Sequence, residues 1–149
     1  MTAKLANYTT TVSASKSVQE IQKMLQDHGA TQILIDYDKG KPVGLSFIIP
    51  LRYGVYPFRL PIKVKNVQDC LNRNKVRRVY HPNQEEIDKN RALDVGWRTL
   101  RDWLRAQLTL IEIDQVSFAE VFFSHLRQSD GTTLYEAWES KQKLLGQGK

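Results

Sequence analysis

The sequence predicts an α+β fold in which a small antiparallel sheet is followed by a long helix and two shorter C-terminal helices. Three observations support this prediction. Apolar residues alternate as in strands only in the first half of the chain. The longest run of helical spacing falls between residues 84 and 113. The 149 residues, of which 41% are hydrophobic and 26% charged, are typical of a single domain over residues 1–149.

The first two elements are predicted to be a strand and a helix. Residues 7–13 are rich in threonine, which favours a strand. Ser17 and Glu20 have the spacing of a capping box. A helix is therefore expected over residues 18–28, ending before Gly29, which fits the glycine that commonly follows a helix.

A hairpin and a third strand come next. Residues 31–37 and 43–49 alternate between apolar and polar side chains and flank a turn at residues 38–41. Residues 56–64 alternate as well, with aromatic and aliphatic side chains on one face. Their other face carries Pro57, Arg59, Pro61 and Lys63. Because proline cannot donate to a ladder, this strand is expected at a sheet edge or with a bulge.

The helical half is predicted to begin with a short helix over residues 66–73. The Cys70 side chain is expected to point into the core. The long helix over 84–113 has two apolar stripes, so it should pack on more than one side or form an oligomer interface. The remaining side of this helix carries a charged residue at every seventh position and is expected to face solvent. These residues are Arg91, Arg98, Arg105 and Glu112. Gly96, inside this helix, indicates close packing against a neighbour.

Two capping boxes predict the last helices. Ser117 with Glu120, and Thr133 with Glu136, each precede an apolar helical pattern. The expected order is β-α-β-β-β-α followed by three helices, which should cover one face of the sheet. The break at residues 81–83 would allow a subdivision into an α/β part, 1–80, and a helical part, 84–145.

The positive charge is concentrated in one segment. Residues 52–78 carry a net charge of +7, whereas the rest of the chain sums to −1. Such a local excess indicates an anionic partner, DNA or RNA or an acidic protein surface. The alternative is a solvated face, or charges paired with acidic helix residues such as Glu85 and Glu86. The candidate binding residues are Arg52, Tyr53, Arg59, Lys63, Lys65, Arg73, Lys75, Arg77 and Arg78.

Several classes of function lack a signal. The single cysteine cannot form an internal disulfide, which indicates a reducing, cytoplasmic location. No apolar run has the length of a signal sequence or membrane span. The histidines, His28, His81 and His125, lack metal-site spacing, and no phosphate-loop glycine pattern occurs. We therefore expect no enzymatic activity, no cofactor, no metal and no membrane partner.

Three segments resemble a family of small bacteriophage and prophage proteins with no settled activity. These segments are residues 57–61, residues 97–103 with 106–108 and 111–112, and residues 120–123 followed by 131–136. The resemblance implies a phage or mobile-element context and no catalytic residues.

Together, these features predict a non-enzymatic accessory protein that binds nucleic acid or a nucleoprotein complex through a basic strand face. One alternative is an inhibitor or adaptor of a host complex, for example a defence complex, with apolar contacts from the long helix and Trp138. A second alternative is a structural subunit of a larger assembly. The helix over residues 84–113 would be the interface of a homo-oligomer.

Overall fold

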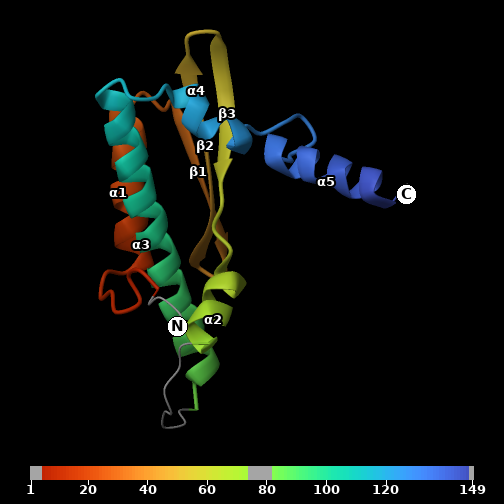
Figure 1. Ribbon diagram of the computed structural model, residues 1–149. Coiled ribbons are helices and arrows are strands. Elements are labelled where there is room, and N and C mark those ends of the chain that lie inside the picture. The colour runs from red at the N-terminus through yellow and green to blue at the C-terminus, as the bar shows by residue number, and fades with distance from the viewer. Residues whose placement is uncertain (1–4, 74–81, 148–149) are drawn as a thin grey trace.

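The computed structural model describes residues 5–73 and 82–147 and confirms the α+β class (Figure 1). The elements are α1 (Ala14–Asp27), β1 (Gln32–Asp38), β2 (Lys41–Leu51), β3 (Gly54–Leu60), α2 (Val64–Arg73), α3 (Gln84–Glu112), α4 (Phe118–Phe122), a 3₁₀ turn η1 (Phe123–His125) and α5 (Leu134–Gln147). The strands form one antiparallel sheet in the order β1-β2-β3. Figure 1 shows α1 and α3 side by side along the sheet, with α5 extending away from it.

The prediction for the N-terminal elements was partly wrong. Residues 7–13 form a turn and irregular backbone instead of a strand. The helix begins four residues earlier than expected, because Ser13 caps it by accepting from the Lys16 amide at 3.2 Å. Asp94 of α3 accepts from the Ala14 amide at 2.8 Å, so a distant residue helps to set this start. Ser17 is therefore a buried residue inside the helix, and its capping-box assignment was wrong.

The hairpin was predicted correctly. Lys39 and Gly40 both have positive φ, as a two-residue type I′ turn requires. The third strand is at the sheet edge, as its prolines indicated, but it ends at Leu60. Val64 begins α2, so the alternation of residues 61–64 reflects a linker and the first turn of a helix.

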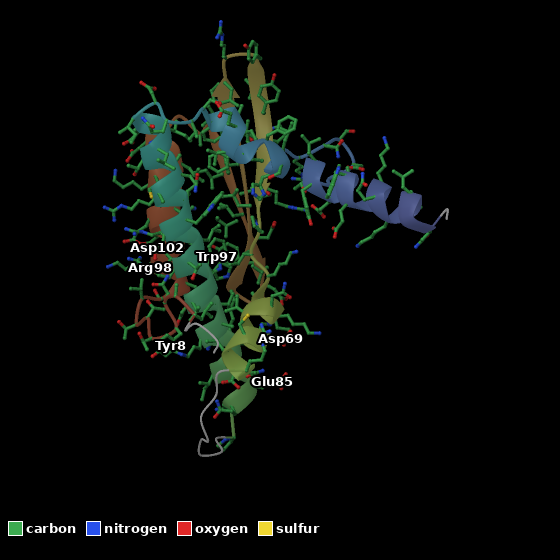
Figure 2. The ribbon with its side chains drawn as sticks, viewed as in Figure 1. Tyr8, Asp69, Glu85, Trp97, Arg98 and Asp102 are labelled. Atoms are coloured by element: carbon green, nitrogen blue, oxygen red, sulfur yellow. The ribbon has the colours of Figure 1, made fainter. Side chains whose placement is uncertain are left out.

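The core lies between one face of the sheet and the helices α1, α3 and α4. Phe47 and Phe58 of the sheet stack on each other and meet Phe118 and Phe122 of α4 at ring-centroid distances of 5.5–6.2 Å. Trp97 lies between α3 and the sheet, where its indole N–H donates to the Pro42 carbonyl at 2.9 Å (Figure 2). These contacts fix α3 and α4 on the same sheet face, as expected, whereas the expectation that the last helix also covers this face was wrong, because α5 extends away from the sheet and contributes no buried residue.

The polar side of α3 lies beside α1, and three of its four predicted solvent-facing residues, Arg91, Arg105 and Glu112, are exposed as expected, whereas Arg98 is not. Arg98 pairs with Glu20 of α1 and is mostly buried. At the far end of the same side, Glu112 Oε1 lies 2.7 Å from His28 Nε2. The seven-residue repeat thus provides polar contacts between the two helices. No helix among the described residues is long and apolar enough to cross a membrane.

Candidate protein-binding surfaces

The residues of the predicted basic segment do not gather on one surface of the described chain. Arg52 and Tyr53 form the turn between β2 and β3, whereas Lys65 and Arg73 lie on α2. Figure 1 places this turn and α2 at opposite ends of the molecule. Three further candidates, Lys75, Arg77 and Arg78, lie outside the described residues. The described cations of the segment are therefore distributed along the length of the protein.

Arg59 and Lys63 were expected on one strand face, about 13 Å apart at 3.3 Å per residue. That expectation was wrong, because β3 ends at Leu60 and Lys63 belongs to the linker that leads into α2. Both side chains do line one shallow cleft of about 700 Å³, together with Asp36, Glu136 and Glu139. The acidic residues give this cleft a mixed charge instead of a basic one.

The remaining described candidates are exposed. The Arg52 guanidinium lies 5.5 Å from the centroid of the Tyr53 ring, which is 81% exposed. Lys65 is exposed on α2. Arg73 Nη2 lies 2.8 Å from the Cys70 Sγ, so the last turn of α2 places a cation beside the half-buried thiol.

Arg59 joins β3 to the beginning of α5. Its guanidinium pairs with Glu136 and also donates to the Gly131 carbonyl at 3.3 Å. The Glu136 carboxylate accepts from the Thr133 amide at 3.1 Å, and the Thr133 hydroxyl accepts from the Glu136 amide at 3.3 Å, which confirms the predicted capping box. The Thr133 amide, helped by its hydroxyl and Arg59, lowers the pKa of Glu136. These contacts fix the direction in which α5 leaves the sheet.

The outer face of α5 is exposed to solvent and carries large apolar side chains. No residue of this helix is buried. Trp138 is 58% exposed and Leu145 is 61% exposed, and their spacing of seven residues places them on one face. The Tyr135 ring lies 6.0 Å from that of Trp138. We call Tyr135, Trp138 and Leu145 the α5 outer face. An apolar surface of this kind on a water-exposed helix is typical of a protein-contact site.

A second apolar surface lies on the sheet face opposite the core. Leu34 is 54% exposed and Val55 is 64% exposed. Between them, Ile48 pairs with Gln32 on one side and Pro57 on the other. The neighbours of Ile48 in β2, Phe47 and Ile49, are buried in the core, so Ile48 points to the opposite face. We call Leu34, Ile48, Val55 and Pro57 the outer sheet patch.

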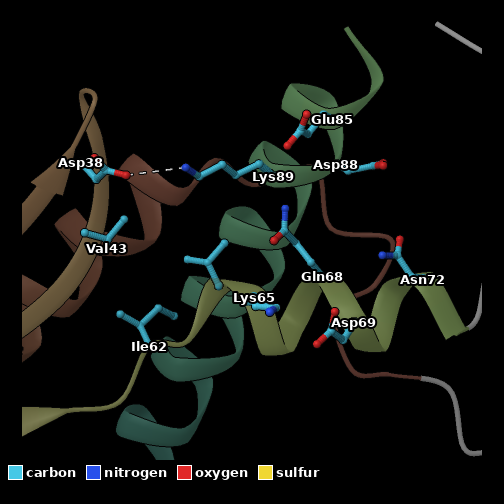
Figure 3. A pocket seen from close by; sticks show the side chains of 11 residues that line it. Asp38, Val43, Ile62, Lys65, Gln68, Asp69, Asn72, Glu85, Asp88 and Lys89 are labelled. Carbon is cyan, nitrogen blue, oxygen red and sulfur yellow. Dashed lines mark ion pairs between the residues drawn. The ribbon is translucent and has the colours of Figure 1, made fainter.

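The open pocket between α2, α3 and the β1–β2 hairpin is lined by both charged and aliphatic side chains (Figure 3). It encloses about 580 Å³, and its charged lining mixes Lys65 and Lys89 with four carboxylates. Within this lining, Lys89 Nζ lies 3.6 Å from the Asp38 carboxylate, so α3 and β1 are joined by an ion pair. Within residues 5–73 and 82–147, no three histidines, cysteines or acids are placed to hold a metal ion.

A further groove, of about 600 Å³, runs between α2 and α3 and is mainly apolar. Trp103 and His125 line it, with ring centroids 6.0 Å apart. Burial lowers the pKa of His125, which favours its neutral form. Gly96 forms part of the floor, where an added Cβ would lie 3.1 Å from Ile62 Cδ1 and 3.3 Å from Val67 Cγ2. This confirms the expectation that Gly96 permits close packing.

Comparison of the chain with protein-family models, curated proteins and solved structures found no match. The resemblance to phage proteins therefore stays a prediction.

Sequence reasoning identified Trp138 as an apolar anchor but did not identify the outer sheet patch. A signal was present, because Ile48 and Ile49 are adjacent in a strand and must point to opposite faces. An apolar residue at both positions indicates that the outer face of the sheet is also apolar.

Proposed function

We propose that the protein acts by binding another protein, without chemistry of its own, and that the α5 outer face is the contact surface. The observation that carries this proposal is the exposure of Trp138 and Leu145 on a helix that extends from the body of the domain. Tryptophan is enriched among the residues that dominate binding energy at protein interfaces. The resemblance to phage proteins suggests a host or phage complex as the partner, with the chain as an accessory subunit, adaptor or inhibitor.

The anchoring of α5 supports the same proposal. Because Glu136 is held by Thr133 and Arg59, the helix leaves the domain in a defined direction. A binding surface that is positioned before the partner arrives loses less conformational entropy on association. The ion pair between Arg59 and Glu136 also removes one cation from the set expected to meet nucleic acid.

Affinity purification of the tagged full chain, with and without nuclease, tests the proposal. The variant Trp138→Ser/Leu145→Ser is compared with Lys65→Glu/Arg73→Glu, which reverses the charge of α2. Ile113→Ser is the matched control, because Ile113 is also 58% exposed but lies directly after the last residue of α3. We expect a defined protein partner that survives nuclease treatment and is lost only with the α5 variant.

The opposite pattern would favour nucleic-acid binding. In that case the purified material would contain DNA or RNA, and charge reversal on α2 would release it while the α5 variant would retain it. Phosphate contacts by lysine and arginine would also make retention fall steeply with salt.

A further inference from the structure

Two exposed apolar surfaces occur on the same chain, and neither covers the other within it. Glu136 is turned toward Arg59, so the first turn of α5 presents its polar side to its own domain. Tyr135 lines the cleft that α5 shares with its own sheet, but Trp138 and Leu145 are well exposed, so nothing in the described chain covers this end of the α5 outer face. Leu34 and Val55 are equally uncovered on the sheet face that α1, α3 and α4 do not cover.

We propose that α5 of one copy docks on the outer sheet patch of a second copy, and that the second copy's α5 docks on the first in return. This inference rests on the proposed function, since it names the partner of the α5 outer face as another copy of the chain. The result is a two-fold dimer in which each protomer contributes one helix and one sheet face.

The length of α5 is similar to that of the strands on which it would lie. A 14-residue helix is about 21 Å long at 1.5 Å per residue. The seven-residue strand β1 extends about 23 Å at 3.3 Å per residue. A stable dimer buries about 1,200–2,000 Å² in total. Because a two-fold exchange makes the same contact twice, each helix–sheet contact has to supply only half of that area.

The charges of the two surfaces are complementary. Lys141 lies between Trp138 and Leu145 on the α5 outer face, at spacings of three and four residues. Asp36 lies two residues from Leu34 in β1 and is exposed on the outer side of the sheet. Its carboxylate lies over Gly44, where an added Cβ would be 2.6 Å from Asp36 Oδ2. None of the described residues forms an ion pair with Asp36, so it offers an acceptor for the incoming Lys141.

Pairing of α5 with α5 is less favourable on the same grounds. Lys141 would then meet the Trp138–Leu145 stripe of another α5, and that stripe contains no acidic residue. Such pairing would also leave Leu34 and Val55 in water. Docking of α5 on the sheet of the second copy covers both apolar surfaces, and it places Lys141 beside Asp36.

Sedimentation equilibrium of the full chain tests this arrangement with two complementary variants. Leu34→Asp places a charge in the outer sheet patch, and Trp138→Ser removes the anchor from α5. We expect the wild type to form a concentration-dependent dimer and each variant alone to dimerise at least tenfold more weakly. Both positions are more than half exposed, and circular dichroism confirms the fold of each variant. If Leu34→Asp unfolds, Val55→Asp takes its place, and if Trp138→Ser unfolds, Leu145→Asp takes its place.

An equimolar mixture of Leu34→Asp and Trp138→Ser gives the decisive result. The wild-type α5 of the first variant can dock on the wild-type sheet of the second, so the mixed dimer keeps one intact contact. Neither variant alone keeps any. Recovery of a 1:1 heterodimer in the mixture therefore supports the exchange, and no recovery contradicts it.

The remaining outcomes separate this inference from the proposed function. If the wild type stays monomeric at hundreds of micromolar, the exchange is overturned. The proposed function still holds in that case if the wild type co-purifies with a different protein and the Trp138→Ser/Leu145→Ser variant does not. A dimer that Trp138→Ser weakens and Leu34→Asp does not overturns the exchange in favour of α5–α5 pairing. A dimer that neither variant affects overturns the exchange and leaves the α5 outer face without a role in self-association.

Discussion

Arg59 on β3 and Glu136 in the first turn of α5 form an ion pair across 77 residues of sequence. The same carboxylate closes the capping box with Thr133, so one side chain both starts the helix and attaches it to the sheet. Because both side chains of the pair are partly exposed, its main consequence is the direction of α5, with a modest effect on global stability.

Loss of this pair should loosen α5 more than it destabilises the domain. We expect Arg59→Ala to lower the free energy of unfolding by about 0.5–1 kcal/mol, as is usual for partly exposed pairs. Glu136→Ala should cost about 1–2 kcal/mol, because it also removes the capping contacts with Thr133. Urea denaturation gives the free energies, and hydrogen exchange should show faster opening of residues 134–147.

Glu139→Ala is the control for these variants. Its ion pair with Lys143 lies within α5, at 3.6 Å, and does not touch the sheet. If Glu139→Ala opened α5 as much as Arg59→Ala, the attachment of α5 by Arg59 would be refuted.

Replacement of Ser17 by alanine should stabilise the protein. The Ser17 hydroxyl is buried in α1 and has no hydrogen-bond partner among the described residues. Removal of an unsatisfied buried polar group, together with the higher helix propensity of alanine, should add about 1 kcal/mol to the free energy of unfolding. Ser15→Ala, at an exposed position of the same helix, should change stability by less than half as much. Destabilisation by Ser17→Ala would show that the hydroxyl has a partner.

Enlarging Gly96 should separate α2 from α3. A Cβ at this position meets the ends of two flexible side chains, Ile62 and Val67, at 3.1 and 3.3 Å. Gly96→Ala should therefore be nearly neutral, because about 1 kcal/mol of helix propensity offsets a small displacement of these side chains. Gly96→Val adds bulk that the site cannot hold, and we expect a loss of about 1–3 kcal/mol in thermal or urea unfolding. Equal stability of the two variants would contradict the close approach of the helices.

Protonation of His125 should destabilise the fold. Burial lowers the folded-state pKa of His125 below the ordinary value of 6.5. The neutral ring therefore contributes stability that is fully present above pH 6.5 and is lost as the pH falls from 6.5 through the folded pKa. Urea midpoints at pH 7.5 and 5.5 should differ more for the wild type than for His125→Gln. An identical pH dependence of the two proteins would remove His125 as the cause.

The α5 outer face should contribute to binding without contributing to stability. Trp138 and Leu145 are exposed, so Trp138→Ser/Leu145→Ser should change the free energy of unfolding by about 0.5 kcal/mol or less. Trp97 provides the contrast, because it is fully buried and donates to the Pro42 carbonyl. Trp97→Ala should cost about 3–5 kcal/mol. A large stability loss in the α5 variant would mean that this face packs within the chain.

Local chemistry made much of the fold predictable. Gly40 in a two-residue turn specifies the hairpin, and the capping boxes at Ser117 and Thr133 mark the starts of α4 and α5. The start of α1 was not predictable in the same way, because Ser13 and Ser17 both lie near the expected start of the helix and either could cap it. The contact of Asp94 with the Ala14 amide adds to the Ser13 cap, and no local pattern encodes it.

The candidate surfaces were only partly predictable for the same reason. The charge count correctly located a cation-rich segment, but a strand, a linker and a helix distribute its described members over the molecule. The pairing of Arg59 with Glu136 depends on tertiary contacts between distant segments. The exposure of Trp138 likewise depends on where α5 points, which its own sequence does not determine.

Hydroxyl-radical footprinting of the full chain, in the cells that produce it and after dilution of the purified protein, shows whether a partner covers Trp138. Trp97 is buried and should be protected in both samples, whereas the exposed Tyr53 should react in both. We predict that Trp138 is protected in cells and reactive in the dilute protein, because the α5 outer face is covered by a protein partner. Equal reactivity of Trp138 in both samples, with protection of Tyr53 in cells instead, would contradict the account and favour the basic residues as the binding surface.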